Sequence, residues 1–171
     1  MNRQKIDNNG FSLVEIIIVL AIVSVLTGTV SYGLSYFSGK PAEECAQKTT
    51  SVLSHARTTT MGKYKVLVQI KNNAGVISIE QSVYRSQEDY NNNTPEITTT
   101  VVGAKGVDFE YSCDGTNYVQ LGEGDTLTLE FSRSTGALKE NGAGAYWQYF
   151  RISKAQTIRD ISIVPLTGRI G

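Results

Sequence analysis

The stretch that decides the fold runs from Gly10 to Leu26 and reads GFSLVEIIIVLAIVSVL. From Phe11 to Gly39 the only charged side chain is Glu15. At about 1.5 Å of rise per residue, an apolar helix of this length can cross a hydrocarbon layer of roughly 30 Å. We therefore predict an N-terminal membrane helix over residues 11–34.

The residues ahead of this helix predict its orientation. Arg3 and Lys5 outnumber Asp7 in the short N-terminal tail, and a positive bias of this kind keeps a tail in the cytoplasm. We therefore expect a single-pass protein of the cytoplasmic membrane whose remaining chain is extracytoplasmic.

Glu15 places a carboxylate inside the apolar segment. Such a group costs about 2.5 to 3.5 kcal/mol at the centre of a membrane helix, less near an end, and it usually has a partner. No Lys, Arg or His lies within helical reach of Glu15. If the chain were cut after Gly10, the new amino group of Phe11 would supply a positive charge, on the same copy or on a neighbouring one. The isolated carboxylate therefore predicts processing and assembly.

At these residues the chain resembles the type IV pilin and type II secretion pseudopilin superfamily, whose leaders end in Gly followed by Phe-Thr/Ser-Leu-x-Glu and an apolar helix. The resemblance implies cleavage after Gly10 by a prepilin peptidase, N-methylation of Phe11 and a role for Glu15 in filament assembly. It also implies other pilin or pseudopilin subunits and an inner-membrane assembly platform as partners. The product would be a pilus or secretion filament, extracellular or periplasmic after assembly.

Two other interpretations of the apolar segment remain open. It could be a secretory signal peptide cut near residues 27–29, Thr-Gly-Thr, although such peptides have an apolar core of about 7 to 15 residues. It could also be a plain membrane anchor in which Glu15 is incidental, although acids inside membrane segments are rare.

The remaining chain predicts an α+β, pilin-like fold, in which a long helix packs on an antiparallel β-rich head. We expect a cleaved leader over residues 1–10, the membrane or filament-core helix over 11–34, its amphipathic continuation over 35–62 and the head over 63–171. Small and apolar residues recur at helical spacing in the continuation: Ala42, Cys45, Ala46, Thr49, Val52, Leu53 and Ala56. Gly62 is expected to end this helix, and Pro41 either kinks it or starts its second half.

Beyond Gly62 the pattern changes to that of strands. Residues 65–71 and 76–84 predict a hairpin, and residues 85–95 predict an exposed loop. Further strands are expected at residues 97–102, 107–112, 126–132, 146–153 and 158–164.

Three separated segments look like the GspH/FimT group of minor pseudopilins and minor pilins. They are the segment Val52–Gly62, which contains a helical Leu-x-x-Ala-Arg stretch, the strand 127–131 that ends in Phe before Gly136, and the terminal pair Gly168-Arg169. This resemblance implies a minor subunit of the filament.

Cys45 and Cys113 are the only two cysteines. In an exported head they could form a disulfide, which would stabilise the fold by about 2 to 4 kcal/mol. A buried free thiol at Cys45 is the alternative. Their long separation does not match a metal or redox motif.

The sequence offers no convincing catalytic residue, metal ligand set or cofactor motif, so we do not expect an enzyme. The sole histidine, His55, lies on the structural helix, and an anchored hydrolase would need a pocket around it with an acid nearby. The oxygen-rich loop over residues 88–93 could ligate calcium, but it lacks the EF-hand spacing.

The charge balance disfavours nucleic acid as a partner. The chain has 16 basic and 16 acidic residues, and removal of the leader would leave 14 and 15. Binding to a polyanion normally requires a basic surface. A competence-type pseudopilin or adhesin, whose head binds DNA or a surface ligand, is kept as the alternative function.

Overall fold

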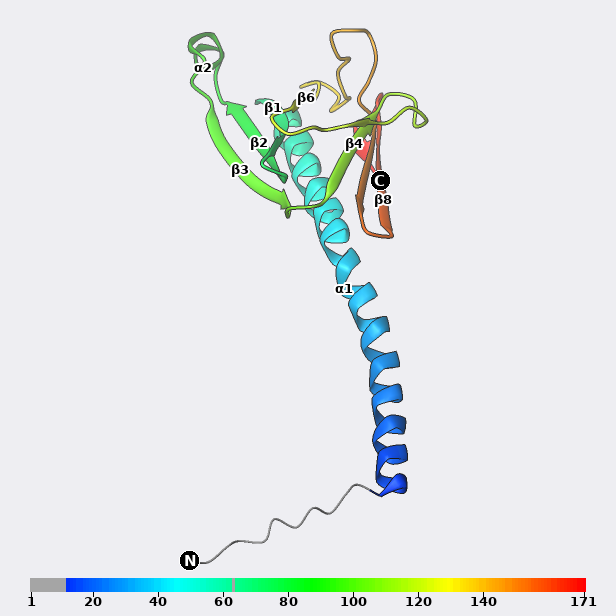
Figure 1. Cartoon of the computed structure of the whole chain (residues 1–171). Helices are drawn as coiled ribbons and strands as arrows, with labels where there is room; N and C mark the ends of the chain where they lie inside the picture. The colour runs from blue at the N-terminus through cyan, green and yellow to red at the C-terminus, as the bar shows by residue number, and fades with distance from the viewer. Residues whose placement is uncertain (1–11, 63) are drawn as a thin grey trace, which may run out of the picture. The chain divides into compact units, whose positions relative to one another are not determined.

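A computed structural model of the chain describes residues 12–62 and 64–171, with only the backbone given for residues 28–38. Between Phe37 and Ser38 the chain divides into two compact units. The first unit contains the described start of helix α1. The second contains the remainder of α1 and the described strands (Figure 1).

Helix α1 runs continuously over Leu13–Met61. At its start, the Ser12 hydroxyl accepts a hydrogen bond from the Glu15 N–H at 3.2 Å, which is the arrangement of an N-cap. At its end, the Gly62 N–H donates to the carbonyls of Thr58 and Thr59, both at 3.1 Å. The predicted end of the helix at Gly62 is therefore confirmed.

Pro41 lies inside α1, so the alternative that it starts a second helix is wrong. Proline lacks an N–H and removes one intrahelical hydrogen bond. Packing on both sides of it offsets this loss. Gly39 is buried so closely against Thr157 that a Cβ atom would overlap its hydroxyl, and Ala42 is fully buried.

The first sheet has four antiparallel strands in the order β3-β2-β1-β6. Its strands are β1 (Lys65–Asn73), β2 (Val76–Tyr84), β3 (Glu96–Gly103) and β6 (Thr126–Glu130). Strands β1 and β2 pair from Lys65 with Tyr84 to Asn73 with Val76, which confirms the predicted hairpin.

The second sheet has five strands in the order β5-β4-β7-β8-β9, and each neighbouring pair is antiparallel. Its strands are β4 (Asp108–Ser112), β5 (Val119–Gln120), β7 (Tyr149–Lys154), β8 (Thr157–Val164) and β9 (Arg169–Ile170). The sequence did not predict β5 and β9, because two residues are too few to show an alternating pattern. The two sheets and α1 confirm the α+β class.

Apart from shifts of one or two residues at strand ends, two segments differ from the prediction. Strand β7 begins at Tyr149 instead of residue 146, because the Asn141 side chain accepts hydrogen bonds from the N–H groups of Ala143 and Ala145 and holds the preceding residues in a loop. The predicted loop over residues 85–95 contains a short helix, α2 (Gln87–Asn92). Ser86 caps this helix in a capping box, an arrangement that Ser-x-x-Asp indicates in the sequence.

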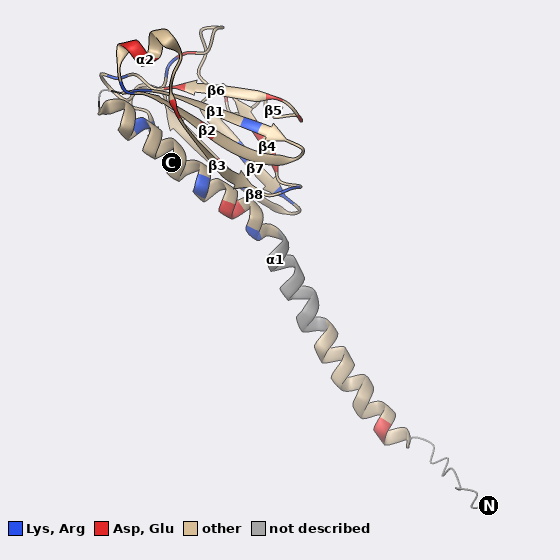
Figure 2. Ribbon diagram, turned by 90° about the vertical axis from the view of Figure 1, so that its left-hand side faces the viewer, with Lys and Arg blue, Asp and Glu red and all other residues tan. Residues whose placement is uncertain are grey.

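The hydrophobic core belongs to the second unit. Every fully packed member of the core lies between Ala42 and Ile163, so the unit from Ser38 to Gly171 contains its own core. The α1 residues predicted to face the sheets are buried, with Val52 half-buried: Ala42, Cys45, Ala46, Thr49, Leu53 and Ala56. Figure 2 shows this part of α1 lying along one side of the strands.

Candidate functional site

Glu15 is the one member of the predicted processing and assembly site that the structure describes. Gly10 and Phe11 lie outside the described residues. Glu15 occupies the first turn of α1 and is exposed, and the six ion pairs identified among the described residues do not include it. A carboxylate at a helix N-terminus is favoured by the helix dipole, which partly offsets its cost in apolar surroundings.

The described side chains around and after Glu15, up to Leu26, form an apolar surface on all sides of the helix. Exposure is high from Leu13, at 74%, to Val25, at 68%. The hydroxyls of Ser24 and Thr27 donate to the carbonyls of Leu20 and Val23, both at 2.7 Å, so these polar groups are satisfied within the helix. Exposed apolar area on this scale usually marks a contact with other molecules or lipid.

A membrane crossing is not confirmed for this helix. Within the described part of the chain, no helix combines the length and the apolar character that a transmembrane span needs.

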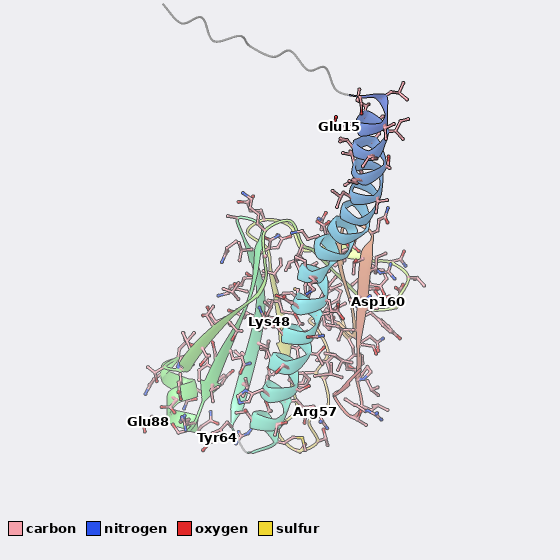
Figure 3. All side chains as sticks on the ribbon, turned by 90° about the horizontal axis from the view of Figure 1, so that it is seen from below. Glu15, Lys48, Arg57, Tyr64, Glu88 and Asp160 are labelled. Atoms are coloured by element: carbon pink, nitrogen blue, oxygen red, sulfur yellow. The ribbon has the colours of Figure 1, made fainter. Side chains whose placement is uncertain are left out.

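Arg57 marks a junction in the second unit where α1, the loop that contains Gly136 and the turn that contains Gly168 meet. Its Nε donates to the Thr167 carbonyl at 3.0 Å and so joins α1 to the turn between β8 and β9. A Cβ atom at Gly136 would lie 2.7 Å from Met61 Sδ and 3.1 Å from Arg57 Nε. Segments separated by more than a hundred residues are thus held together near the C-terminal end of α1, where Figure 3 labels Arg57.

Gly168 completes this Arg57 junction. Its φ is +64°, which favours glycine, and a Cβ atom there would overlap the Gly136 carbonyl oxygen. Its N–H donates to the Val164 carbonyl at 2.7 Å, and the Leu138 N–H donates to the Pro165 carbonyl at 2.8 Å. The close packing at Gly136 and Gly168 indicates that the residues of the junction hold the fold together.

His55 lines an open groove of about 480 Å³ between α1, β2 and β3. Its Nδ1 lies 3.3 Å from Gln81 Oε1, and Gln81 Nε2 donates to the Val52 carbonyl at 3.1 Å. The acid in this groove, Glu96, accepts a hydrogen bond from Arg85 Nε at 2.9 Å. His55 is therefore part of a contact between helix and sheet, and no sequence pattern pointed to its partner Gln81.

The oxygen-rich segment over residues 88–93 uses its side chains locally. Asp89 accepts from the Ser86 N–H at 2.9 Å, and the Asn91 and Asn93 side-chain oxygens accept from Gln87 and Tyr84 at 3.0 Å each. Among the described residues, no group of three or more His, Cys, Asp or Glu side chains could hold a metal ion.

Both described cysteines are free thiols, so the disulfide alternative is not what the structure contains. Cys45 is fully buried on α1, and burial raises the pKa of its thiol to about 11. Cys113 is half-buried, with Sγ 3.9 Å from Asn141 Nδ2. Burial and the nearby Asp114 raise the pKa of the Cys113 thiol as well. The alternative of a buried free thiol at Cys45 therefore describes the structure.

Comparison with known proteins identifies the N-terminal segment. Residues 6–31 match the family model of the prokaryotic N-terminal methylation motif. No curated protein and no solved structure matches the chain. The motif indicates a type IV pilin-like substrate of prepilin peptidase and supports the pilin and pseudopilin superfamily. It points to a structural subunit that assembles with other pilin subunits, and not to an enzyme.

Proposed function

We propose that this protein is a minor pilin or pseudopilin of the GspH/FimT type, built into a type IV pilus or a type II secretion-like filament. One observation carries the proposal. Glu15 is an exposed carboxylate within the methylation motif, followed by a helix whose described apolar side chains are exposed on every side. A helix of this kind requires other molecules to cover it.

Processing and assembly follow from the chemistry of this segment. Prepilin peptidase cuts after Gly10, and the new amino group of Phe11 is methylated. The apolar helix holds the subunit in the cytoplasmic membrane with its head outside. At the assembly platform, the helix leaves the lipid for the filament core, where Glu15 binds the positively charged Phe11 terminus of a neighbouring subunit. In a low-dielectric core, the paired carboxylate and amino group are less costly to bury than either charge would be alone.

The Arg57 junction supports the GspH/FimT assignment. The segments Leu53–Arg57, Gly136 and Gly168 resemble that group one by one in the sequence, and they contact one another in the folded unit. A shared structural role explains why these residue types occur together.

The alternative, a head that binds DNA, receives no specific support. Six ion pairs among the described residues partner the basic groups Lys65, Lys71, Arg85, Lys139, Arg151 and Arg159 with carboxylates. Neutralised cations contribute little to binding of a polyanion.

The test replaces the assembly carboxylate in the full chain. Glu15→Gln removes the charge and keeps the shape, and it should leave membrane insertion and leader cleavage intact. If the pair contributes at least about 1.4 kcal/mol, incorporation into sheared filaments falls by about tenfold or more. Glu44→Gln is the matched control, because Glu44 is an exposed carboxylate on the same helix. Normal incorporation of Glu15→Gln would refute the assigned role.

A further inference from the structure

A second groove lies beside strand β6 and shares no residue with Glu15 or the Arg57 junction. Its volume is about 460 Å³, within the range of roughly 300–1,000 Å³ that small-molecule sites occupy. Residues 126–130 of β6 form one part of its lining, and Tyr111 of β4, Trp147 and the loop residues 139–142 form the remainder. The groove is therefore a candidate binding site that the assembly role does not use.

Local hydrogen bonds shape this groove. After the Lys139 N–H, which donates to the Glu130 carbonyl at 2.8 Å, the chain leaves β6 and forms the loop that precedes β7. The Asn141 side chain accepts two backbone hydrogen bonds within this loop. At its far end, Gln148 Nε2 donates to the Cys113 carbonyl at 2.6 Å. Because the loop is fixed at both ends, the groove exists before any ligand binds.

Two aromatic rings form the apolar side of the groove. The rings of Tyr111 and Trp147 meet edge to face, with centroids 4.9 Å apart and planes at 88°. Both side chains also pack against the hydrophobic core, which holds the rings in place. Rings fixed in this way lose little conformational freedom when a ligand stacks on them.

Polar groups without partners line the same groove. Tyr and Trp usually hydrogen-bond through their polar tips where they are shielded from water, but the described residues provide no such partner for Tyr111 or Trp147. They provide none for the hydroxyls of Thr126 and Thr128 either, and both threonines are exposed on β6. These four side chains can therefore hydrogen-bond a ligand.

The charges around the groove balance. Lys139 Nζ lies 2.6 Å from Glu130 Oε1, and Lys65 Nζ lies 3.6 Å from the same oxygen. Glu140 supplies a second carboxylate, and its Oε1 accepts a hydrogen bond from the Tyr146 hydroxyl at 3.0 Å. Two cations thus stand against two carboxylates, so the groove has no excess positive charge with which to attract a phosphate or an acidic sugar.

We propose that this groove binds a short neutral oligosaccharide. A pyranose ring has an apolar C–H face, which stacks on an aromatic ring through weak C–H contacts. It also has a rim of hydroxyl groups that donate and accept hydrogen bonds. The groove matches both parts, because the rings of Tyr111 and Trp147 lie in one lining with the hydroxyls of Thr126 and Thr128.

A cationic amine is the ligand that the test must distinguish from a sugar. Trimethylammonium groups bind to aromatic rings through cation–π attraction. Such a ligand gains from an excess of negative charge and has no use for hydroxyl partners. This groove has balanced charges and two unpaired threonine hydroxyls, and a neutral sugar suits both features.

The fluorescence of Trp147 reports on the groove directly, because Trp147 is the only tryptophan in the chain. The full chain is titrated in a polyoxyethylene detergent, which carries no sugar. The probes are neutral trisaccharides of glucose, galactose, mannose or N-acetylglucosamine. At least one of them should shift the Trp147 emission saturably at millimolar concentrations. No saturable shift with any of these trisaccharides, or a tighter response to tetramethylammonium, would overturn the proposal.

Two matched variants place the sugar in the groove. Thr128→Leu removes a groove hydroxyl and adds bulk, so it should weaken binding by about tenfold. Thr99→Leu is the control, because Thr99 is an exposed threonine on β3 that does not line this groove. Equal affinities of the Thr128→Leu and Thr99→Leu chains would also overturn the proposal.

The assembly carboxylate should have no part in this binding. The Glu15→Gln chain should bind the sugar as the native chain does, because Glu15 is not in the lining. The titration therefore tests the groove separately from the filament role, and either proposal can fail without the other.

Discussion

Replacement of Gly168 by alanine tests whether the Arg57 junction holds the head together. A side chain at Gly168 would destabilise the fold for two reasons. Its φ of +64° is left-handed, which costs a non-glycine residue about 1–2 kcal/mol. Its Cβ atom would also overlap the Gly136 carbonyl oxygen, and overpacking of this kind costs about 1–3 kcal/mol. Gly168→Ala should therefore lower the free energy of unfolding by about 2–5 kcal/mol.

Two other glycines serve as matched controls for this prediction. Gly124 has a φ of +85° and no atom within 4 Å of a built Cβ. Gly124→Ala should therefore lower the free energy of unfolding only through its left-handed backbone, by about 1–2 kcal/mol. Gly142 has open space and no left-handed φ. Gly142→Ala should change stability by less than about 1 kcal/mol.

Urea unfolding of the unit from Ser38 to Gly171, followed by circular dichroism, measures the three differences. The unit contains every core residue among the described side chains, so it is a suitable target for equilibrium unfolding. The expected order of stability is Gly142→Ala above Gly124→Ala above Gly168→Ala. A Gly168→Ala unit as stable as the Gly124→Ala unit would refute the close packing at the junction.

Two further predictions concern the core. Leu53 is fully buried, so Leu53→Ala should lower the free energy of unfolding of the same unit, measured with urea, by about 2–5 kcal/mol. Ser54 is its exposed neighbour, and Ser54→Ala should change this free energy by no more than about 0.5 kcal/mol. Burial raises the pKa of the Cys45 thiol from 9.0 to about 11. As the pH rises, the thiol therefore loses its proton in the unfolded chain before it does so in the folded chain, which favours unfolding. The free energy of unfolding should be at its full value below pH 9 and should fall by up to about 3 kcal/mol between pH 9 and 11. A Cys45→Ala unit with the same loss of stability over this pH range would contradict that explanation.

The parts of the fold with regular patterns were predictable from the sequence. The alternation of residues 65–71 and 76–84 identified β1 and β2, and the helical spacing from Ala42 to Ala56 identified the face of α1 that is buried. The other parts of the fold depend on short segments and side-chain contacts that leave no periodic pattern in the sequence. Strands β5 and β9 are too short to show alternation, and β7 starts late because the Asn141 side chain organises the preceding loop.

The candidate site was predictable only in part, for a related reason. Glu15 is conspicuous because charge is rare in an apolar stretch. The contact between Arg57 Nε and the Thr167 carbonyl joins residues 110 positions apart through a backbone group, and a backbone carbonyl has no signature in the sequence. The resemblance pointed to Gly136 and Gly168 separately. Only the contacts in the structure show that both glycines are needed at the same place, the Arg57 junction.

The mass of the N-terminal peptide in purified filaments tests the central claim most directly. Filaments sheared from cells that make the native chain are digested, and the N-terminal peptide is sequenced by tandem mass spectrometry. The account predicts a peptide that begins at Phe11 with one methyl group on its amino nitrogen. A chain in the filament that still carries residues 1–10, or one cut near residues 27–29, would contradict it.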